Sequence, residues 1–255
     1  MLFAASALKG YAIEATDGRL GTVSDLLFDD RTWKVRWMVV DTGNWLSGRK
    51  VLVHPSSVVQ LDHERRVLPV RLTKVQVEES PGISHDQPMS EQMEGSLFNY
   101  YGYDPYWGPS FFGAGAVGML PYSESFAGEA GVVEARRREP VSKPGDPYLC
   151  STQAVVGYHI QAADGAIGHL ENLLVDEESW GVRYLVVDTK NWWPGKHVLL
   201  SPYAAKQIDW SAREVDLDVT CDQVKGSPPW DPASVIERDY EQRLHGHYGW
   251  PGYRF

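Results

Sequence analysis

The chain has 255 residues, of which 43% are hydrophobic and 23% charged, and it carries a formal net charge of −10 at pH 7. This length and composition can bury one large core or two ordinary ones, as in a globular, soluble protein. The excess of carboxylates disfavours nucleic acids and anionic membrane surfaces as partners, because both are bound mainly through Lys and Arg.

Short strands are the first elements that the sequence predicts. Asp17 and Gly18 form a turn signal, because glycine accepts the positive φ of a tight hairpin. Gly21 suggests a bulge just beyond it. Arg36 interrupts a strand that is otherwise apolar, as expected at the centre of a small closed sheet. In chain order, the expected strands cover about residues 10–15, 20–29, 35–40, 50–53, 58–61 and 66–72.

A helix is predicted after the last of these strands. Met89, Met93, Leu97 and Tyr101 recur every four residues, which places them on one face of an amphipathic helix. Five or six short strands with one trailing helix make a small barrel.

The next segment, residues 108–150, is rich in Gly, Ala, Ser and Pro and shows neither the periodicity of a helix nor that of a strand. Such a composition buries little apolar surface, so we expect a linker. Three consecutive basic residues in it, Arg136 to Arg138, stand between Glu134 and Glu139, and we interpret them as solvated.

The chain then repeats itself. VVDTGNWLSGRKVLV, at residues 39–53, matches VVDTKNWWPGKHVLL, at residues 186–200, with a separation of 147 residues. Between positions 8 and 81, about 30 residues are identical to those 147 positions later, without a gap. The helical face recurs as well, as Ile236, Tyr240, Leu244 and Tyr248. Internal duplication therefore predicts a mainly β fold with a first barrel and trailing helix at 1–107, a linker at 108–150, and a second barrel and trailing helix at 151–255.

Two local features of the second helix invite interpretation. Ser234 and Glu237 fit a capping box, which predicts that the helix begins near Ser234. His245 and His247 would place two imidazoles near one metal if the chain there were extended, but the first copy has Phe98 and Tyr100 at these positions. We therefore predict no metal site.

The sequence contains no recognisable catalytic signature. It has no glycine-rich phosphate loop, no G-x-S-x-G elbow and no grouping of Ser, His and Asp. Cys150 and Cys221 lack the close spacing of metal ligands and do not form a disulfide framework. We therefore expect no catalytic residue and no cofactor. The N-terminal stretch is not typical of a signal peptide and no apolar run predicts a membrane span, so we expect a cytoplasmic protein without membrane insertion.

The repeated turn after residue 40 allows two interpretations. Asp41, Asn44 and Gly48 all suit a structural corner, in which Trp45 supplies an apolar lid. The alternative is a binding site, because an exposed tryptophan in a loop is an anchor that protein interfaces favour. We favour the corner.

These patterns together resemble the PRC-barrel domain family. The resemblance lies in GYxIxAxDGxxG, a Trp-containing turn, a VVDT strand, a Trp-containing loop and a VL strand followed by Pro, and it covers roughly 5–80 and 152–227. It implies small β-barrels like those of the cytoplasmic domain of the photosynthetic reaction centre H subunit and the C-terminal domain of the ribosome maturation factor. It also implies a role in binding or assembly rather than catalysis.

The predicted function is accordingly a non-enzymatic protein-binding, scaffold or assembly module, with a protein partner of unknown identity and with homodimerisation as a further option. The tail aromatics would either meet this partner or fold back onto the barrel. The alternative function is a small-molecule receptor or an uncharacterised enzyme that uses a pocket between the barrels. The candidate interaction residues are Trp45, Trp192, Trp193, Tyr248, Trp250 and Tyr253.

Overall fold

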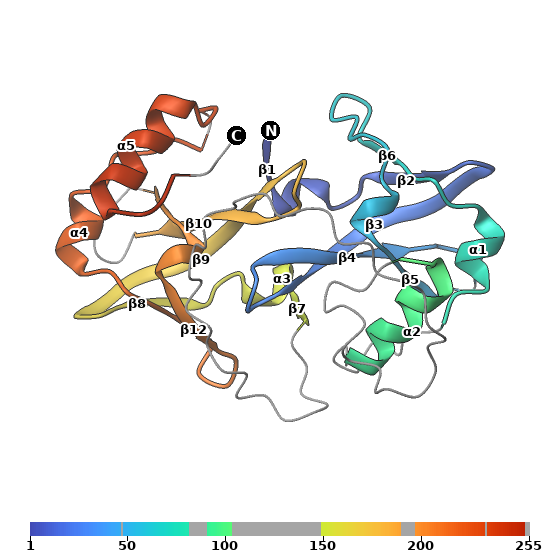
Figure 1. The fold of residues 1–255 in the computed structure, drawn as a ribbon, viewed down its shortest axis with the longest axis horizontal. Coiled ribbons are helices and arrows are strands. Elements are labelled where there is room, and N and C mark those ends of the chain that lie inside the picture. Colours follow the sequence, from blue (N-terminus) through green and yellow to red (C-terminus); the bar gives the residue numbers. More distant parts are fainter. Residues whose placement is uncertain (47, 82–90, 104–148, 190–196, 233, 253–255) are drawn as a thin grey trace, which may run out of the picture. The chain divides into compact units, whose positions relative to one another are not determined.

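The computed structural model describes residues 1–46, 48–81, 91–103, 149–189, 197–232 and 234–252. The chain divides into two compact units, one formed by residues 1–88 with 148–255 and the other by residues 89–147. The first unit contains two β-sheets (Figure 1), which confirms the prediction of a mainly β fold.

The first copy forms one sheet with the strand order β5-β4-β3-β2-β6. Strands β2 and β6 run parallel, and the other neighbours are antiparallel. We call this sheet, with the helix that follows it, the first barrel. Its elements are η1 (Ala5–Leu8), β2 (Ala12–Ala15), β3 (Gly18–Asp29), β4 (Lys34–Asp41), β5 (Lys50–Val53), η2 (Pro55–Ser57), β6 (Val67–Pro69) and α1 (Lys74–Glu78).

The second copy forms a sheet with the order β11-β10-β9-β8-β13-β12, and we call it, with α4, the second barrel. Its elements are α3 (Thr152–Val155), β8 (His159–Ala162), β9 (Gly165–Asp176), β10 (Val182–Asp188), β11 (His197–Leu200), η3 (Pro202–Ala204), β12 (Ala205–Asp209), β13 (Glu214–Leu217) and α4 (Cys221–Lys225). In both barrels the short helix begins with a complete capping box, at Thr73 and at Thr220.

The trailing helices occur in matching register. Helix α2 spans Glu91–Tyr101 and α5 spans Arg238–Tyr248, so both ends agree with the separation of 147 residues. Leu97 and Phe98 of α2 are buried. Helix α5 starts at Arg238 with Glu237 as its N-cap residue, and no side chain caps it. The capping box predicted at Ser234 is therefore wrong, because the amide of Ser234 is already bonded in a turn to the carbonyl oxygen of Asp231.

Two short strands connect the barrels by reciprocal exchange. Strand β1 (Leu2–Ala4) precedes the first barrel but pairs with β9 of the second. Strand β7 (Leu149–Ser151) precedes the second barrel but pairs with β3 of the first. The registers are equivalent, since Leu2 lies opposite Asp176 and Leu149 lies opposite Asp29. Each barrel thus contains a strand from the other copy, and the two sheets form one unit.

Close packing explains one glycine that the two copies share. A Cβ atom at Gly21 would lie 2.1 Å from the carbonyl oxygen of Asp41, and one at Gly168 would lie 2.0 Å from that of Asp188. Both distances are far below van der Waals contact, so only glycine fits where β3 and β9 bend past the next strand. The strand registers shift beside these glycines, as the predicted bulge requires.

The cores are apolar and closely packed. Trp37, Phe28 and Tyr184 are among the largest side chains that are fully buried. Among the described residues, no helix is long and apolar enough to cross a lipid bilayer.

Candidate functional site

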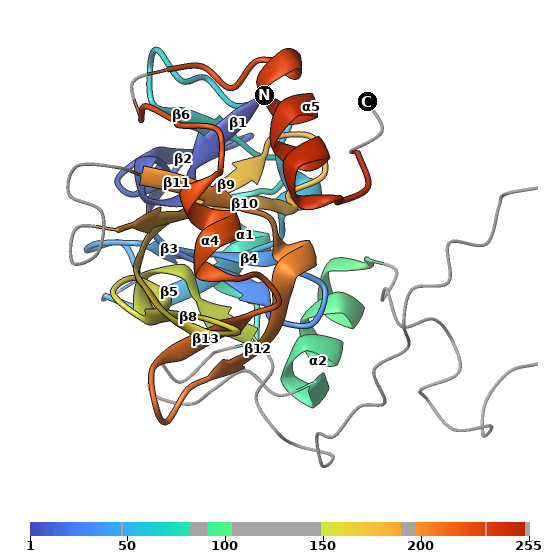
Figure 2. The same ribbon diagram turned by 90° about the vertical axis from the view of Figure 1, so that its left-hand side faces the viewer.

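Helix α5 lies on the second barrel, next to α4 (Figure 2). Leu244 is fully buried in a cluster with Leu174, Tyr184, Val186 and Leu199 of the sheet. The other residues of the predicted helical face, Ile236, Tyr240 and Tyr248, are half-buried against the same cluster. Within α5, the spacing of four residues therefore identified the buried face correctly, whereas Ile236 precedes the helix.

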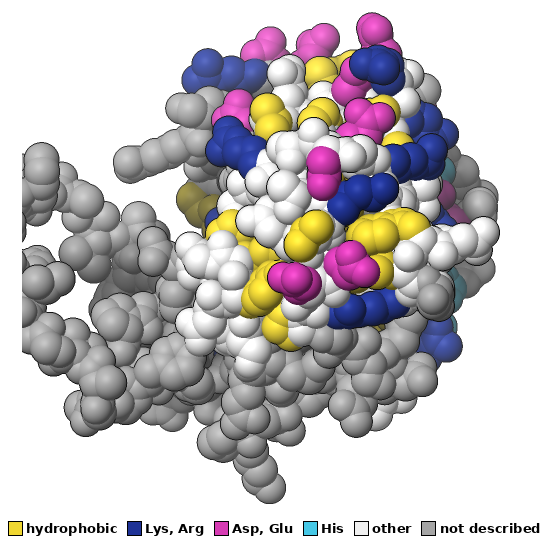
Figure 3. Space-filling model, turned by 90° about the vertical axis from the view of Figure 1, so that its right-hand side faces the viewer, with side chains coloured by type: hydrophobic (Ala, Val, Ile, Leu, Met, Phe, Trp, Pro, Cys, Tyr) yellow, Lys and Arg dark blue, Asp and Glu magenta, His cyan; other side chains and the backbone are white. Residues whose placement is uncertain are grey.

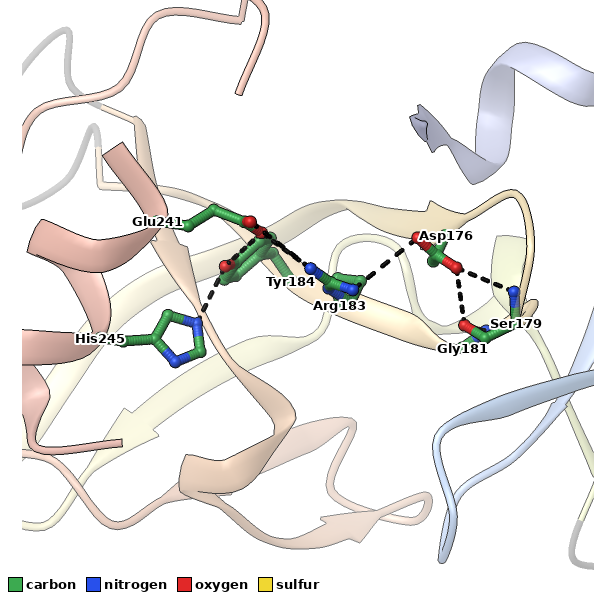
Figure 4. Close-up of polar contacts among 7 residues, drawn as sticks. All are labelled: Asp176, Ser179, Gly181, Arg183, Tyr184, Glu241 and His245. Carbon is green, nitrogen blue, oxygen red and sulfur yellow. Dashed lines mark hydrogen bonds and ion pairs between the residues drawn. The ribbon is translucent and has the colours of Figure 1, made fainter. Parts of the chain in front are cut away.

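A buried ion pair holds α5 to strand β10. Nη2 of Arg183 lies 3.1 Å from Oε1 of Glu241, and the two side chains are only 12% and 9% exposed. Nη1 of Arg183 lies 3.8 Å from Oδ2 of Asp176, and Oδ1 of the same carboxylate accepts hydrogen bonds from Ser179. The guanidinium thus lies between two carboxylates (Figure 4), and the charge of Glu241 is compensated where water is scarce.

Tyr184 and His245 extend this network toward the chain's end. The Tyr184 hydroxyl is 2.9 Å from Oε1 of Glu241 and 2.9 Å from Nε2 of His245. Nδ1 of His245 is 2.7 Å from the carbonyl oxygen of Pro251, so this nitrogen carries a proton. Burial lowers the pKa of His245, against the opposing effects of Pro251 and Glu241. When the imidazole of His245 is neutral, its Nε2 carries no proton. The hydroxyl proton of Tyr184 is then shared between two acceptors, Oε1 of Glu241 and Nε2 of His245.

The tail that follows α5 folds back onto the second barrel. The rings of Tyr248 and Trp250 stack with centroids 4.1 Å apart, and Trp250 meets the edge of His245 at 5.9 Å. Burial raises the pKa of Tyr248 to about 12. Tyr203, which is 53% exposed, lies edge-on to His245 at 6.5 Å. We call Tyr203, Tyr248 and Trp250 the aromatic patch, since Tyr203 and Trp250 meet the ring of His245, Tyr248 stacks on Trp250, and all three retain some exposure.

The two histidines of α5 do not converge on one point. His245 bonds Pro251, whereas Nε2 of His247 donates to the carbonyl oxygen of Gln223, 2.7 Å away, and ties α5 to α4. No cluster of three or more potential metal ligands occurs within the described ranges.

The repeated corner in the first barrel surrounds a shallow pocket. The indole nitrogen of Trp45 donates to the carbonyl oxygen of Leu20, which holds the half-buried ring across the bulge of β3. Lys74 Nζ lies 5.1 Å from the centre of this ring. Thr42 Oγ1 donates to the carbonyl oxygen of Arg49 over 2.5 Å, and Oδ1 of Asp41 accepts the amide of Gly43 over 2.9 Å. The corner thus has the structural role that we expected, and it also has a pocket of about 510 Å³.

The predicted interaction residues are in different places. Trp45 belongs to the corner of the first barrel, and Tyr248 and Trp250 belong to the aromatic patch of the second. Trp192, Trp193 and Tyr253 lie outside the described residues.

Sequence reasoning missed Tyr203 and the pair formed by Arg183 and Glu241. A signal for the pair was present, since both copies keep an arginine in the apolar strand, at Arg36 and Arg183, and a glutamate in the trailing helix, at Glu94 and Glu241. A charge that recurs at equivalent apolar positions indicates a buried partner.

Comparison with known proteins supports the family resemblance for the first copy. Residues 1–77 match the model of the PRC-barrel domain family. An uncharacterised protein of Deinococcus radiodurans is 36% identical over 75 residues. That stretch covers 29% of this chain and 27% of the relative, so the chain spans only about a quarter of the relative's length.

Proposed function

We propose that this chain, whose residues 1–77 match the PRC-barrel domain family, is a non-enzymatic protein-binding or assembly module. Its two barrels, joined by exchanged strands, serve as a rigid base, and the aromatic patch of the second barrel meets a protein partner. The observation that carries the proposal is the patch itself. Tyr203, Tyr248 and Trp250 are partly exposed rings held in place by a buried network.

Rigid, partly exposed aromatic rings suit a protein interface. They offer a large apolar contact area and lose little conformational entropy on binding, because packing already restricts them. Stacking fixes Tyr248 against Trp250, and the bond from His245 to Pro251 fixes the chain that carries Trp250.

Site-specific photocrosslinking tests this proposal. A benzophenone amino acid at Tyr203 should give one discrete protein adduct in lysate of the source cells, and excess unlabelled protein should remove it. Ser56 is the matched control, because it is exposed and occupies the position equivalent to Tyr203 in the first barrel. An adduct between two copies of the chain would identify the partner as a second copy. Identical adducts from both positions, or no competition, would contradict the proposal.

The alternative function, a small-molecule receptor or an enzyme, requires a pocket between the two barrels. The pockets beside α5 and at the Trp45 corner are each lined by residues of a single copy. A receptor or enzyme that uses a pocket between the barrels stays a prediction.

A further inference from the structure

The pocket at the Trp45 corner has features that a structural corner does not need. Its lining comes from β3, from the end of β4 and the turn after it, and from Lys74 of α1. Its volume of about 510 Å³ falls within the range typical of sites for small molecules, roughly 300–1,000 Å³. Figure 3 shows the end of the molecule that carries α1, where basic, acidic and apolar side chains are interspersed.

Two cations line this pocket, from different elements. Arg19 extends from β3, and Lys74 Nζ lies over the face of the Trp45 ring. Within the described part of the chain, neither makes an ion pair with a carboxylate. The carboxylate in the lining, Asp41, uses Oδ1 to accept the amide of Gly43. The lining thus has two formal positive charges and one negative charge, in a chain with a net charge of −10. The carboxylate of Asp17, just outside the lining, accepts the main-chain amide of Lys74 over 2.8 Å.

The second copy keeps most of the corner's sequence but has different charged residues in it. Gly168, Asp188, Thr189, Asn191 and Trp192 correspond to Gly21, Asp41, Thr42, Asn44 and Trp45. The positions equivalent to Arg19 and Lys74, however, hold Ala166 and Cys221. Gly43 of the lining, in turn, corresponds to Lys190, which lies outside the described residues. The combination of Arg19 and Lys74 is therefore specific, in sequence, to the first copy.

We infer that the Trp45 pocket of the first barrel binds a small organic anion, whose carboxylate or phosphate group lies between Arg19 and Lys74 and whose apolar part lies against Trp45. The pinned indole ring supplies a preformed apolar wall, because its nitrogen is already bonded to the carbonyl oxygen of Leu20. The ammonium of Lys74, held over that ring, needs little rearrangement to meet an anion. This site is independent of the aromatic patch and its protein partner.

Nuclear magnetic resonance with simple aromatic anions tests the inference. Benzoate and phenyl phosphate are titrated into the isotope-labelled full-length protein, and benzylamine serves as the probe of opposite charge. The Trp45 indole signal is assigned with a Trp45→Phe variant. At least one of the two anions should shift the Trp45 indole and the amides of Arg19 and Lys74 with saturation, whereas benzylamine should not. A response to one anion alone would tell whether the site takes carboxylate or phosphate.

Two double variants distinguish binding in this pocket from a general effect of the protein's charge. Arg19→Ala with Lys74→Ala removes both cations from the pocket lining, and affinity for the anion should fall at least tenfold. Arg65→Ala with Arg71→Ala removes the same charge from exposed positions of the same barrel and should leave affinity within twofold. The spectra of the unliganded variants report whether they fold. Shifts that do not saturate, or equal affinity in the two double variants, would overturn the inference.

Discussion

The main-chain amide of Val35 donates a hydrogen bond to the carbonyl oxygen of Trp180 over 2.8 Å. The equivalent pair, the amide of Val182 and the carbonyl oxygen of Trp33, forms at 2.7 Å. With the exchanged strands on either side, these bonds join the two barrels through a continuous set of backbone contacts. The stability of each barrel should therefore depend on residues that belong to the other copy.

Replacement of Phe3 tests this dependence. Phe3 is 7% exposed, and its ring meets Trp180 of the second copy edge-on at 5.7 Å. Phe3→Ala should lower the free energy of unfolding by about 3 kcal/mol, because it removes a buried aromatic ring. Urea denaturation, followed by tryptophan fluorescence, measures the change. Val59→Ala, at a residue that is 56% exposed, should change it by less than about 0.5 kcal/mol.

Fragments should reassemble if the strands are exchanged as described. When residues 1–107 and 148–255 are produced together as separate chains, a tag on one should purify both in equal amounts. Each supplies the strand that completes the other's sheet, so each alone should be poorly soluble, with an unpaired strand edge. Phe3→Asp in the first fragment is the control that should weaken assembly. Independent, monomeric fragments would refute the exchange.

The pH dependence of stability should contain a contribution from His54. Burial, followed by the charges of Arg36 and Lys34, lowers the pKa of His54 to about 3. The unfolded chain takes up a proton near pH 6.5 and the folded chain does not, so stability is full above pH 6.5 and falls as the pH drops from there toward 3. Between pH 7 and pH 5 this loss should amount to about 1–2 kcal/mol.

His54→Asn isolates that contribution. Asparagine can still accept the amide of Ser56, as Nδ1 of His54 does at 3.2 Å, and it does not titrate. Chemical denaturation at pH 7 and at pH 5 should therefore show a smaller difference in the variant than in the parent. His159→Asn, at an exposed position, controls for the removal of an imidazole elsewhere. An unchanged difference in His54→Asn would show that His54 is not the group responsible.

The ion pair beneath α5 should contribute strongly to the docking of this helix. Glu241→Gln leaves the buried guanidinium of Arg183 without its nearest carboxylate, 3.1 Å away, and should cost about 3 kcal/mol of unfolding free energy. Near-ultraviolet circular dichroism should also lose the signal of the ordered Tyr248 and Trp250 rings. Gln242→Ala, at the adjacent exposed position, should leave both unchanged. Full retention of stability in Glu241→Gln would contradict the role of the pair.

The repeat made much of the fold predictable. Strand after strand recurs with a separation of 147 residues. The spacing of Tyr240, Leu244 and Tyr248 identified the buried face of α5, because a helical period directly reports which residues share a side. The exchange of β1 and β7 was not predictable. Each is only three residues long, and the partner of a strand so short is determined by tertiary packing rather than by its own sequence.

The candidate site was predicted less well, for related reasons. Trp45 stood out because its turn recurs, but the cations of its pocket, Arg19 and Lys74, lie 55 positions apart in segments that no motif connects. Tyr203 follows an apolar strand in an unremarkable turn, and only the return of the tail brings Trp250 and His245 toward it. Such convergence depends on the path of the chain after α5, which local patterns do not specify.

Reciprocal strand exchange also determines the order in which the newly synthesised chain can fold. Strand β1 is translated early, yet its ladder partner, from Leu174 to Asp176, leaves the ribosome only after most of the chain has been made. Likewise, the edge of β3 from Leu27 to Asp29 stays unpaired during synthesis until β7 has left the ribosome. The first copy therefore cannot complete its strand pairing while it is being synthesised. The final structure forms when synthesis is nearly complete.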